Sequence, residues 1–141
     1  MPTEARFKKE LQNGRMIESV DEMTDGYQEA LRRILLVSAD TELLSAPAYY
    51  EQSLSAPSLE ARASCVSVIQ DELGHGHIAY RLLEELGEDK QHLIYERDPH
   101  EFHNTYGFDQ YLETFAELVT AHAFFDRAGI TLLGDIHENT T

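Results

Sequence analysis

Apolar residues recur every three or four positions along three long stretches of the chain, which is the spacing of an amphipathic helix. The first stretch begins at Asp21, and we expect this helix to end near Pro47. Its inward positions are Tyr27, Leu31, Ile34, Leu35, Ser38 and Glu42. Small and polar residues between Ala48 and Pro57 predict a connecting loop.

The second stretch has helix signals at both ends. Ser58 is a typical N-cap residue, and Gly87 is typical of the position just after a helix. Between them the repeat runs through Cys65, Ile69, Glu72, Gly76, Ala79, Leu83 and Leu86. These alternating intervals of four and three predict a helix that is packed along its whole length.

A third repeat predicts a helix that opens at Phe108 or Asp109 and fades near Gly134. Its inward positions are Tyr111, Phe115, Leu118, His122, Phe125 and Gly129. A short helix is also expected from Gln91 to Glu96.

The pattern contains no alternating, strand-like run, so we expect an all-α fold. Three long helices and one short helix indicate an incomplete antiparallel bundle. We assign residues 20–134 to this bundle, residues 1–19 to an N-terminal arm and residues 135–141 to a tail.

The composition indicates one acidic domain. The chain has 141 residues and a net charge of −15, with 11 Lys and Arg against 26 Asp and Glu. Such a surface repels nucleic-acid phosphates and anionic lipid headgroups, so we expect no nucleic-acid partner and no membrane partner. No apolar run approaches the roughly 20 residues of a membrane span, and the first residues lack the apolar core of a signal peptide. With Cys65 as the one cysteine, we expect a soluble cytoplasmic protein.

Acidic residues interrupt the apolar stripes at matching depths. Glu42 lies on the inward stripe of the first helix and Glu72 on that of the second, and His75 shares the face of Glu72 because it follows three residues later. A carboxylate buried in such a stripe needs a cation, a partner or a raised pKa. Carboxylate and imidazole ligands suit divalent iron or manganese. The competing interpretation is a solvated acidic face, because a Glu-x-x-His pair alone is weak evidence.

Two further features lie on these helices. Gly74 and Gly76 each cost roughly 1 kcal/mol relative to alanine inside a helix, so we expect both to allow close approach of a neighbouring backbone or a ligand. His122 precedes Asp126 by four residues on the third helix. It is either a ligand, or a residue that orients a ligand, or a core histidine bonded to a carboxylate.

Two stretches of the sequence resemble a known family. They are SADTELLSAP, at residues 38–47, and SAPSLEARASCVSVIQDELGHGHIAYRLLEELG, at residues 55–87. The family is that of the catalytic A subunits of bacterial multicomponent phenylacetyl-CoA epoxidases, which are ferritin-like di-iron proteins. FFDRAGITLLGD, at residues 124–135, is similar to the family's third core helix. The resemblance covers roughly residues 25–134.

The resemblance implies a di-iron monooxygenase that acts in phenylacetate catabolism. By this likeness Glu42, Glu72 and His75 correspond to metal ligands, Asp126 is the candidate ligand from the third helix, and Glu117 is its alternative. It also implies an iron cofactor, an NADPH-dependent reductase and other oxygenase subunits as partners, and an acyl-CoA substrate whose aromatic ring receives one oxygen atom from O2.

Ferritin-like sites use a carboxylate helix followed by a Glu-x-x-His helix twice. If the second Glu-x-x-His motif followed Asp126 at the interval that separates Glu42 from Glu72, it would lie beyond Thr141, where this sequence ends. Three explanations fit this pattern: the chain is part of a longer protein, it is one half of a symmetric dimer, or its last helix comes from another polypeptide. Two other functions therefore stay open: a symmetric-dimer iron-binding or ferroxidase-like protein, and an inactive fragment or structural subunit.

Overall fold

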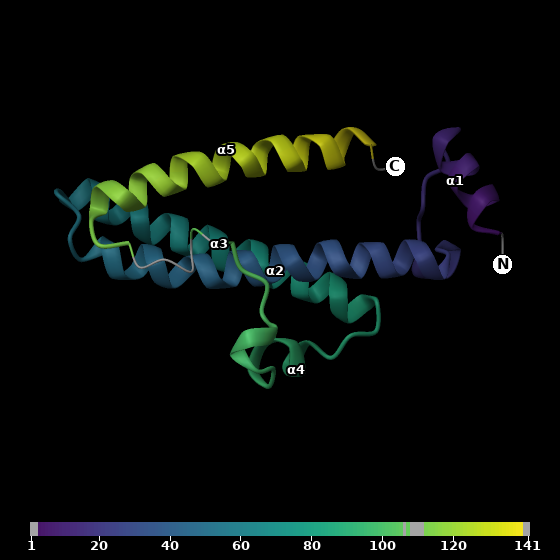
Figure 1. Cartoon of the computed structure of the whole chain (residues 1–141), viewed down its shortest axis with the longest axis horizontal. Coiled ribbons are helices and arrows are strands. Elements are labelled where there is room, and N and C mark those ends of the chain that lie inside the picture. The colour runs from purple at the N-terminus through teal and green to yellow at the C-terminus, as the bar shows by residue number, and fades with distance from the viewer. Residues whose placement is uncertain (1–2, 106, 108–111, 140–141) are drawn as a thin grey trace.

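The computed structural model describes residues 3–105, 107 and 112–139, and in the last helix the side chains of residues 133 and 135–139 lie outside the description. The described residues form five α-helices and two short 3-10 helices, with no β-strand. This confirms the all-α prediction, and the arrangement is that of a ferritin-like helical bundle (Figure 1).

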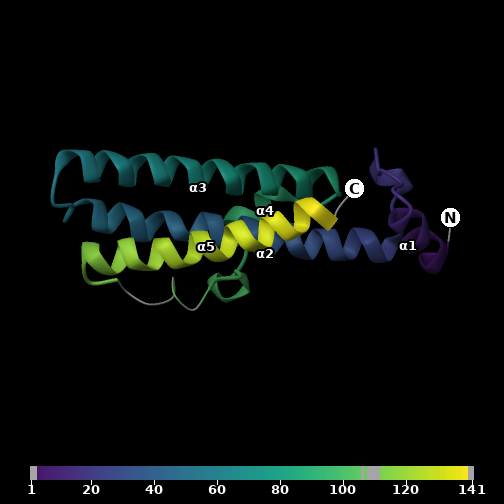
Figure 2. The ribbon, with the colours of Figure 1, turned by 90° about the horizontal axis from the view of Figure 1, so that it is seen from above.

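Three long helices make the bundle. Helix α2 (Asp25–Ser53) and helix α3 (Leu59–Glu85) run antiparallel, and helix α5 (Phe115–Asn139) lies over α2 and crosses it when seen from above (Figure 2). Helix α4 (Lys90–Tyr95) and the 3-10 helix η2 (Pro99–Glu101) form a small protrusion below the bundle (Figure 1). No helix among the described residues is both long enough and apolar enough to cross a membrane.

The predicted ends of α3 are confirmed. The Ser58 hydroxyl accepts a hydrogen bond from the Ala61 amide at 3.2 Å. Gly87 has a φ of +92°, and the amides of Gly87 and Glu88 donate to the carbonyls of Glu84 and Leu83 at 3.0 Å. This is the backbone pattern of a helix that ends on a glycine.

The prediction that the first helix ends near Pro47 is wrong, because α2 continues to Ser53. Pro47 removes one backbone hydrogen bond, but Tyr49, Gln52 and Ser53 beyond it are buried. Packing of this last part of α2 therefore outweighs the local cost of the proline.

The third long helix also differs from the prediction. The expected start at Phe108 or Asp109 lies outside the described residues, but residues 112–114 are not helical and α5 begins at Phe115. The Thr114 hydroxyl accepts from the Glu117 amide at 3.2 Å, while the Glu117 carboxylate accepts from the amides of Glu113 and Thr114. This reciprocal cap fixes the start of the helix. At its other end α5 passes Gly134, where we expected it to fade, and reaches Asn139.

The N-terminal segment contains helix α1 (Glu4–Gln12), which packs on the start of α2. Phe7 is 1% exposed, and its ring meets the Tyr27 ring edge-on at a centroid distance of 5.4 Å. The Glu4 carboxylate accepts from the Gly26 amide at 3.1 Å. The division of the chain into arm, bundle and tail stays a prediction.

Two apolar clusters hold α2 and α3 together. The first consists of Ala39, Ala79, Tyr80, Leu83 and Leu93, and joins α2 and α3 to α4. The second consists of Tyr49, Cys65 and Leu118, and joins α2 and α3 to α5. Along both α2 and α3, the acidic residues and the histidine singled out above lie between these two clusters.

Candidate metal centre

Glu42 on α2 and the Glu72–His75 pair on α3 lie together between the two core clusters. One ligand atom from each of the three residues lies within 4.8 Å of the others. The His75 Nδ1 atom is 3.7 Å from Glu42 Oε2, and the imidazole is largely exposed while the Glu42 side chain is 29% exposed. The cluster is therefore open on its imidazole side and enclosed on its carboxylate side.

Burial and charge make Glu72 an unusual carboxyl group. Burial, a hydrogen bond with Glu42 and the negative charge of Glu42 together raise the pKa of Glu72 to about 8, against a small opposing effect of His75. At neutral pH the metal-free chain thus keeps a proton between two carboxyl groups. A divalent cation would replace that proton, and two carboxylates with one imidazole form a donor set that suits iron or manganese.

Gly76 explains why α2 and α3 come close at this point. A Cβ atom at this position would lie 3.4 Å from the Ala39 carbonyl oxygen and 3.5 Å from the Glu42 Cβ atom. The prediction of a close approach is therefore confirmed for Gly76. At Gly74 no neighbouring protein atom lies within 4 Å of the corresponding point, so the predicted approach of a backbone is wrong there, and the alternative of a ligand stays a prediction.

Asp126 lies near the cluster and is held by other residues. Its charge contributes to the raised pKa of Glu72, but it is not one of the three residues whose ligand atoms come together. Asp126 Oδ2 is 3.1 Å from His122 Nε2. The opposite ring nitrogen of His122, Nδ1, is hydrogen-bonded to the Tyr49 hydroxyl. Glu117 is engaged in the cap of α5 and lies apart from the cluster.

A second polar cluster, which no pattern in the sequence indicated, lies on another face of α2. Asp40 is fully buried, and its carboxylate accepts from Tyr80 at 2.6 Å, from the guanidinium of Arg97, and from the His103 amide at 3.0 Å. Although burial opposes it, these hydrogen bonds lower the pKa of Asp40. The cluster fastens the segment after α4 to the bundle, so its role is structural.

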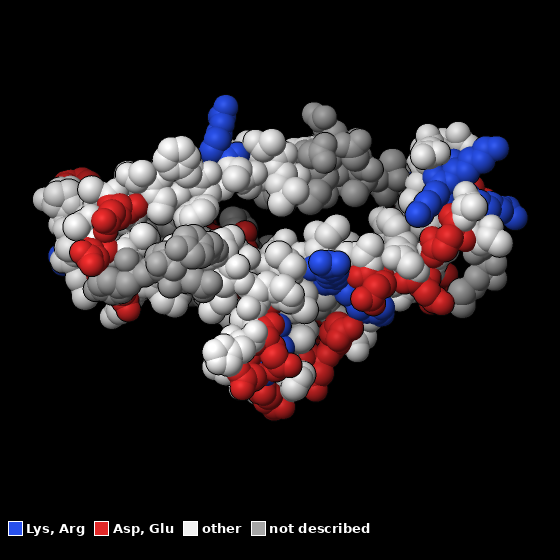
Figure 3. Space-filling model, in the orientation of Figure 1, with Lys and Arg blue, Asp and Glu red and all other residues white. Residues whose placement is uncertain are grey.

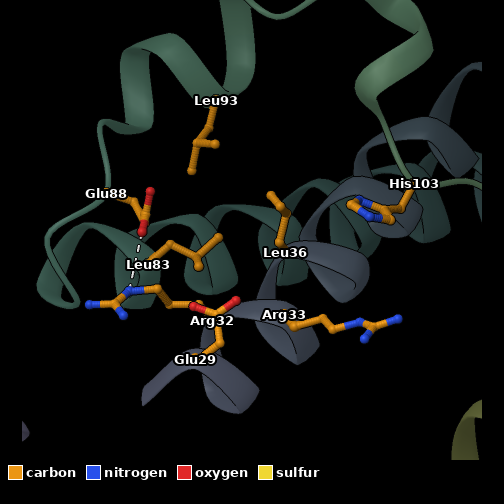
Figure 4. A pocket seen from close by; sticks show the side chains of 8 residues that line it. All are labelled: Glu29, Arg32, Arg33, Leu36, Leu83, Glu88, Leu93 and His103. Carbon is orange, nitrogen blue, oxygen red and sulfur yellow. Dashed lines mark ion pairs between the residues drawn. The ribbon is translucent and has the colours of Figure 1, made fainter. Parts of the chain in front are cut away.

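A hollow of about 440 Å³ lies between α2, α3 and α4 (Figure 4). Arg32 stands at its edge, where it pairs with Glu88 at 3.1 Å and donates to the Leu86 carbonyl at 2.8 Å. None of Glu42, Glu72 and His75 lines it. This hollow is thus separate from the candidate metal centre. Its lining residues are Glu29, Arg32, Arg33, Leu36, Leu83, Glu88, Leu93 and His103.

Comparisons with known proteins show the family of the chain. The chain is 32% identical over 87 residues to the A subunit of the 1,2-phenylacetyl-CoA epoxidase of Escherichia coli (strain K12). The aligned part is 62% of this chain and 28% of that relative, so the chain spans well under half of the relative's length. No solved structure matches the chain. The family described as "Phenylacetic acid catabolic protein" matches residues 6–141, and the chain therefore belongs to this family.

Proposed function

We propose that this chain is a metal-binding oxygenase component, related to the phenylacetyl-CoA epoxidase, in which Glu42, Glu72 and His75 hold iron. The observation that carries the proposal is the meeting of these three donors between two core clusters, with Glu72 protonated in the absence of a cation. Iron held there would supply the activation of O2: one oxygen atom would enter the aromatic ring of an acyl-CoA, and the other would leave as water, with two protons and two electrons from the NADPH-dependent reductase.

The side chains have distinct roles in this proposal. Glu42 and Glu72 supply negative charge to the cation, and Glu72 releases its proton as the metal binds. His75 supplies a neutral nitrogen donor. The clusters around Ala39 and around Tyr49 keep water from reaching the cation along the bundle axis.

Anaerobic loading with Fe(II), followed by removal of free metal and measurement of iron per chain, tests the proposal. We expect wild type to retain iron and Glu72→Gln to bind it at least about tenfold more weakly, since a neutral amide supplies no negative charge to the cation. Glu85→Gln is the matched control, because Glu85 is an exposed glutamate on the same helix. Equal iron retention by Glu72→Gln and wild type would overturn the proposal. Circular dichroism checks that the variants keep their helices.

Oxygen consumption separates the oxygenase from the ferroxidase-like alternative. The oxygenase proposal predicts consumption that depends on an aromatic acyl-CoA, an NADPH-dependent reductase and the other oxygenase subunits. A ferroxidase-like protein would instead oxidise Fe(II) with the purified chain and no organic substrate. Loading with Mn(II) in a parallel sample measures whether the donor set prefers iron to manganese.

A further inference from the structure

Tyr49 is a buried residue that belongs to no ligand set but stands beside the candidate metal centre. It is 3% exposed and packs with Cys65 and Leu118. The charges of Glu72, Asp126 and Glu42 all act on its phenol. Burial and then these charges raise the pKa of Tyr49 above its usual value, so the hydroxyl keeps its proton at neutral pH.

The Tyr49 hydroxyl needs an acceptor, and His122 provides one. Leaving a buried hydroxyl without an acceptor costs about 1–3 kcal/mol of folding free energy. The hydroxyl is hydrogen-bonded to His122 Nδ1, and the imidazole stands edge-on to the phenol with centroids 5.2 Å apart. For the hydroxyl to donate, Nδ1 must be unprotonated. A ring proton of His122 is then on Nε2.

The Nε2 atom of His122 is the one that meets Asp126. Nε2 lies 3.1 Å from Asp126 Oδ2, so a proton on Nε2 faces that carboxylate. The Asp126 side chain is 51% exposed. The chain of contacts therefore runs from a buried phenol on α2, through His122, to a carboxylate on α5.

We propose that Tyr49 is a positioning residue for the candidate metal centre: it fixes His122 as the Nε2–H tautomer, and His122 then holds the Asp126 carboxylate beside Glu72. The inference rests on the proposed function for a metal held by Glu42, Glu72 and His75 near Asp126, but the tautomer itself does not depend on any metal. Residues that orient a ligand in this way affect metal affinity by about 10- to 100-fold.

The variant Tyr49→Phe tests the proposal because it removes the hydroxyl and keeps the ring in the core. Tyr50→Phe is the control, since Tyr50 is the neighbouring tyrosine and is 63% exposed. In metal-free protein, ¹⁵N NMR of the histidine rings reports the protonation of each nitrogen. We expect His122 to be a single Nε2–H tautomer in wild type and in Tyr50→Phe, and a mixture of protonation forms in Tyr49→Phe.

Co(II), which does not react with air on the time scale of a titration, serves as the metal probe. We expect Co(II) to bind about 10- to 100-fold more weakly to Tyr49→Phe than to wild type, with a changed visible spectrum, while Tyr50→Phe matches wild type. An unchanged His122 tautomer in Tyr49→Phe would overturn the proposal. A changed tautomer with unchanged Co(II) affinity and spectrum would also overturn it, because Tyr49 would then be merely structural. If wild type bound no Co(II) or Fe(II), the proposed function would fail, whereas the NMR result would still decide the tautomer.

Discussion

At the scale of the residue, Glu72 combines burial with a neighbouring carboxyl group. The pKa of Glu72 is raised to about 8 in the folded chain, against an ordinary value of 4.5. The unfolded chain therefore loses this proton at lower pH than the folded chain does. As pH rises from about 4.5 to about 8, ionisation increasingly favours the unfolded state, and the metal-free chain loses stability.

The variant Glu72→Gln should remove this loss. We expect metal-free Glu72→Gln to be more stable than wild type by on the order of 1 kcal/mol at pH 9, after discounting for the half-exposed position, and to show little difference at pH 4. Urea denaturation in the presence of a chelator at both pH values measures the effect. A stability difference of the same size at pH 4 and pH 9 would contradict the ionisation argument.

The sequence allowed only some of the residues around the site to be predicted. Glu42 and Glu72 were identifiable because each interrupts an apolar stripe whose period sets the inward face of its own helix, and His75 was identifiable because it follows Glu72 by three residues. The role of Tyr49 depends on how α5 crosses α2, which the period within one helix does not determine. The pairing of Asp40 with Arg97 was hidden for the same reason, since Arg97 reaches α2 from an irregular segment.

At the scale of the element, local signals predicted some helix ends and misled at others. Ser58 and Gly87 act through their own backbone and side chain, so they could be read directly. The Thr114–Glu117 cap has the sequence form of a capping box and could have located the start of α5. The end of α2 could not be read at Pro47, because the tertiary burial of Tyr49 and Gln52 decides it.

Two glycines on α3 form a matched pair for testing the contact between α2 and α3. We expect Gly76→Leu to destabilise the fold by about 1–3 kcal/mol and to weaken metal binding, because the side chain would push against the Ala39 carbonyl and Glu42. Gly74→Leu should keep metal binding and gain up to about 1 kcal/mol, because it improves helix propensity in open space. Urea denaturation and Co(II) titration measure both effects. Equal behaviour of the two variants would show that the close approach at Gly76 is unimportant.

At the scale of the molecule, the bundle leaves apolar side chains in water. Val119, Phe124, Ile130 and Leu132 on α5 are each at least half exposed. Figure 3 shows acidic side chains gathered over the α4 protrusion. Exposed apolar surface favours association, whereas a net charge of −15 opposes the approach of two copies.

These opposing effects predict a salt-dependent self-association of the purified chain. In a purified sample, the only other apolar surface that α5 can meet is that of a second copy of the chain. We therefore expect the average molecular mass to rise from 16.1 kDa toward that of a dimer as the protein concentration increases. Added salt should strengthen the association, because it screens the repulsion between acidic surfaces while leaving apolar burial intact. Sedimentation equilibrium measures both dependences. Phe124→Ser should weaken the association, whereas Leu59→Ser, on an exposed leucine at the start of α3, should not. A chain that stays monomeric at high salt and high concentration would show that the α5 face does not pair with a second copy.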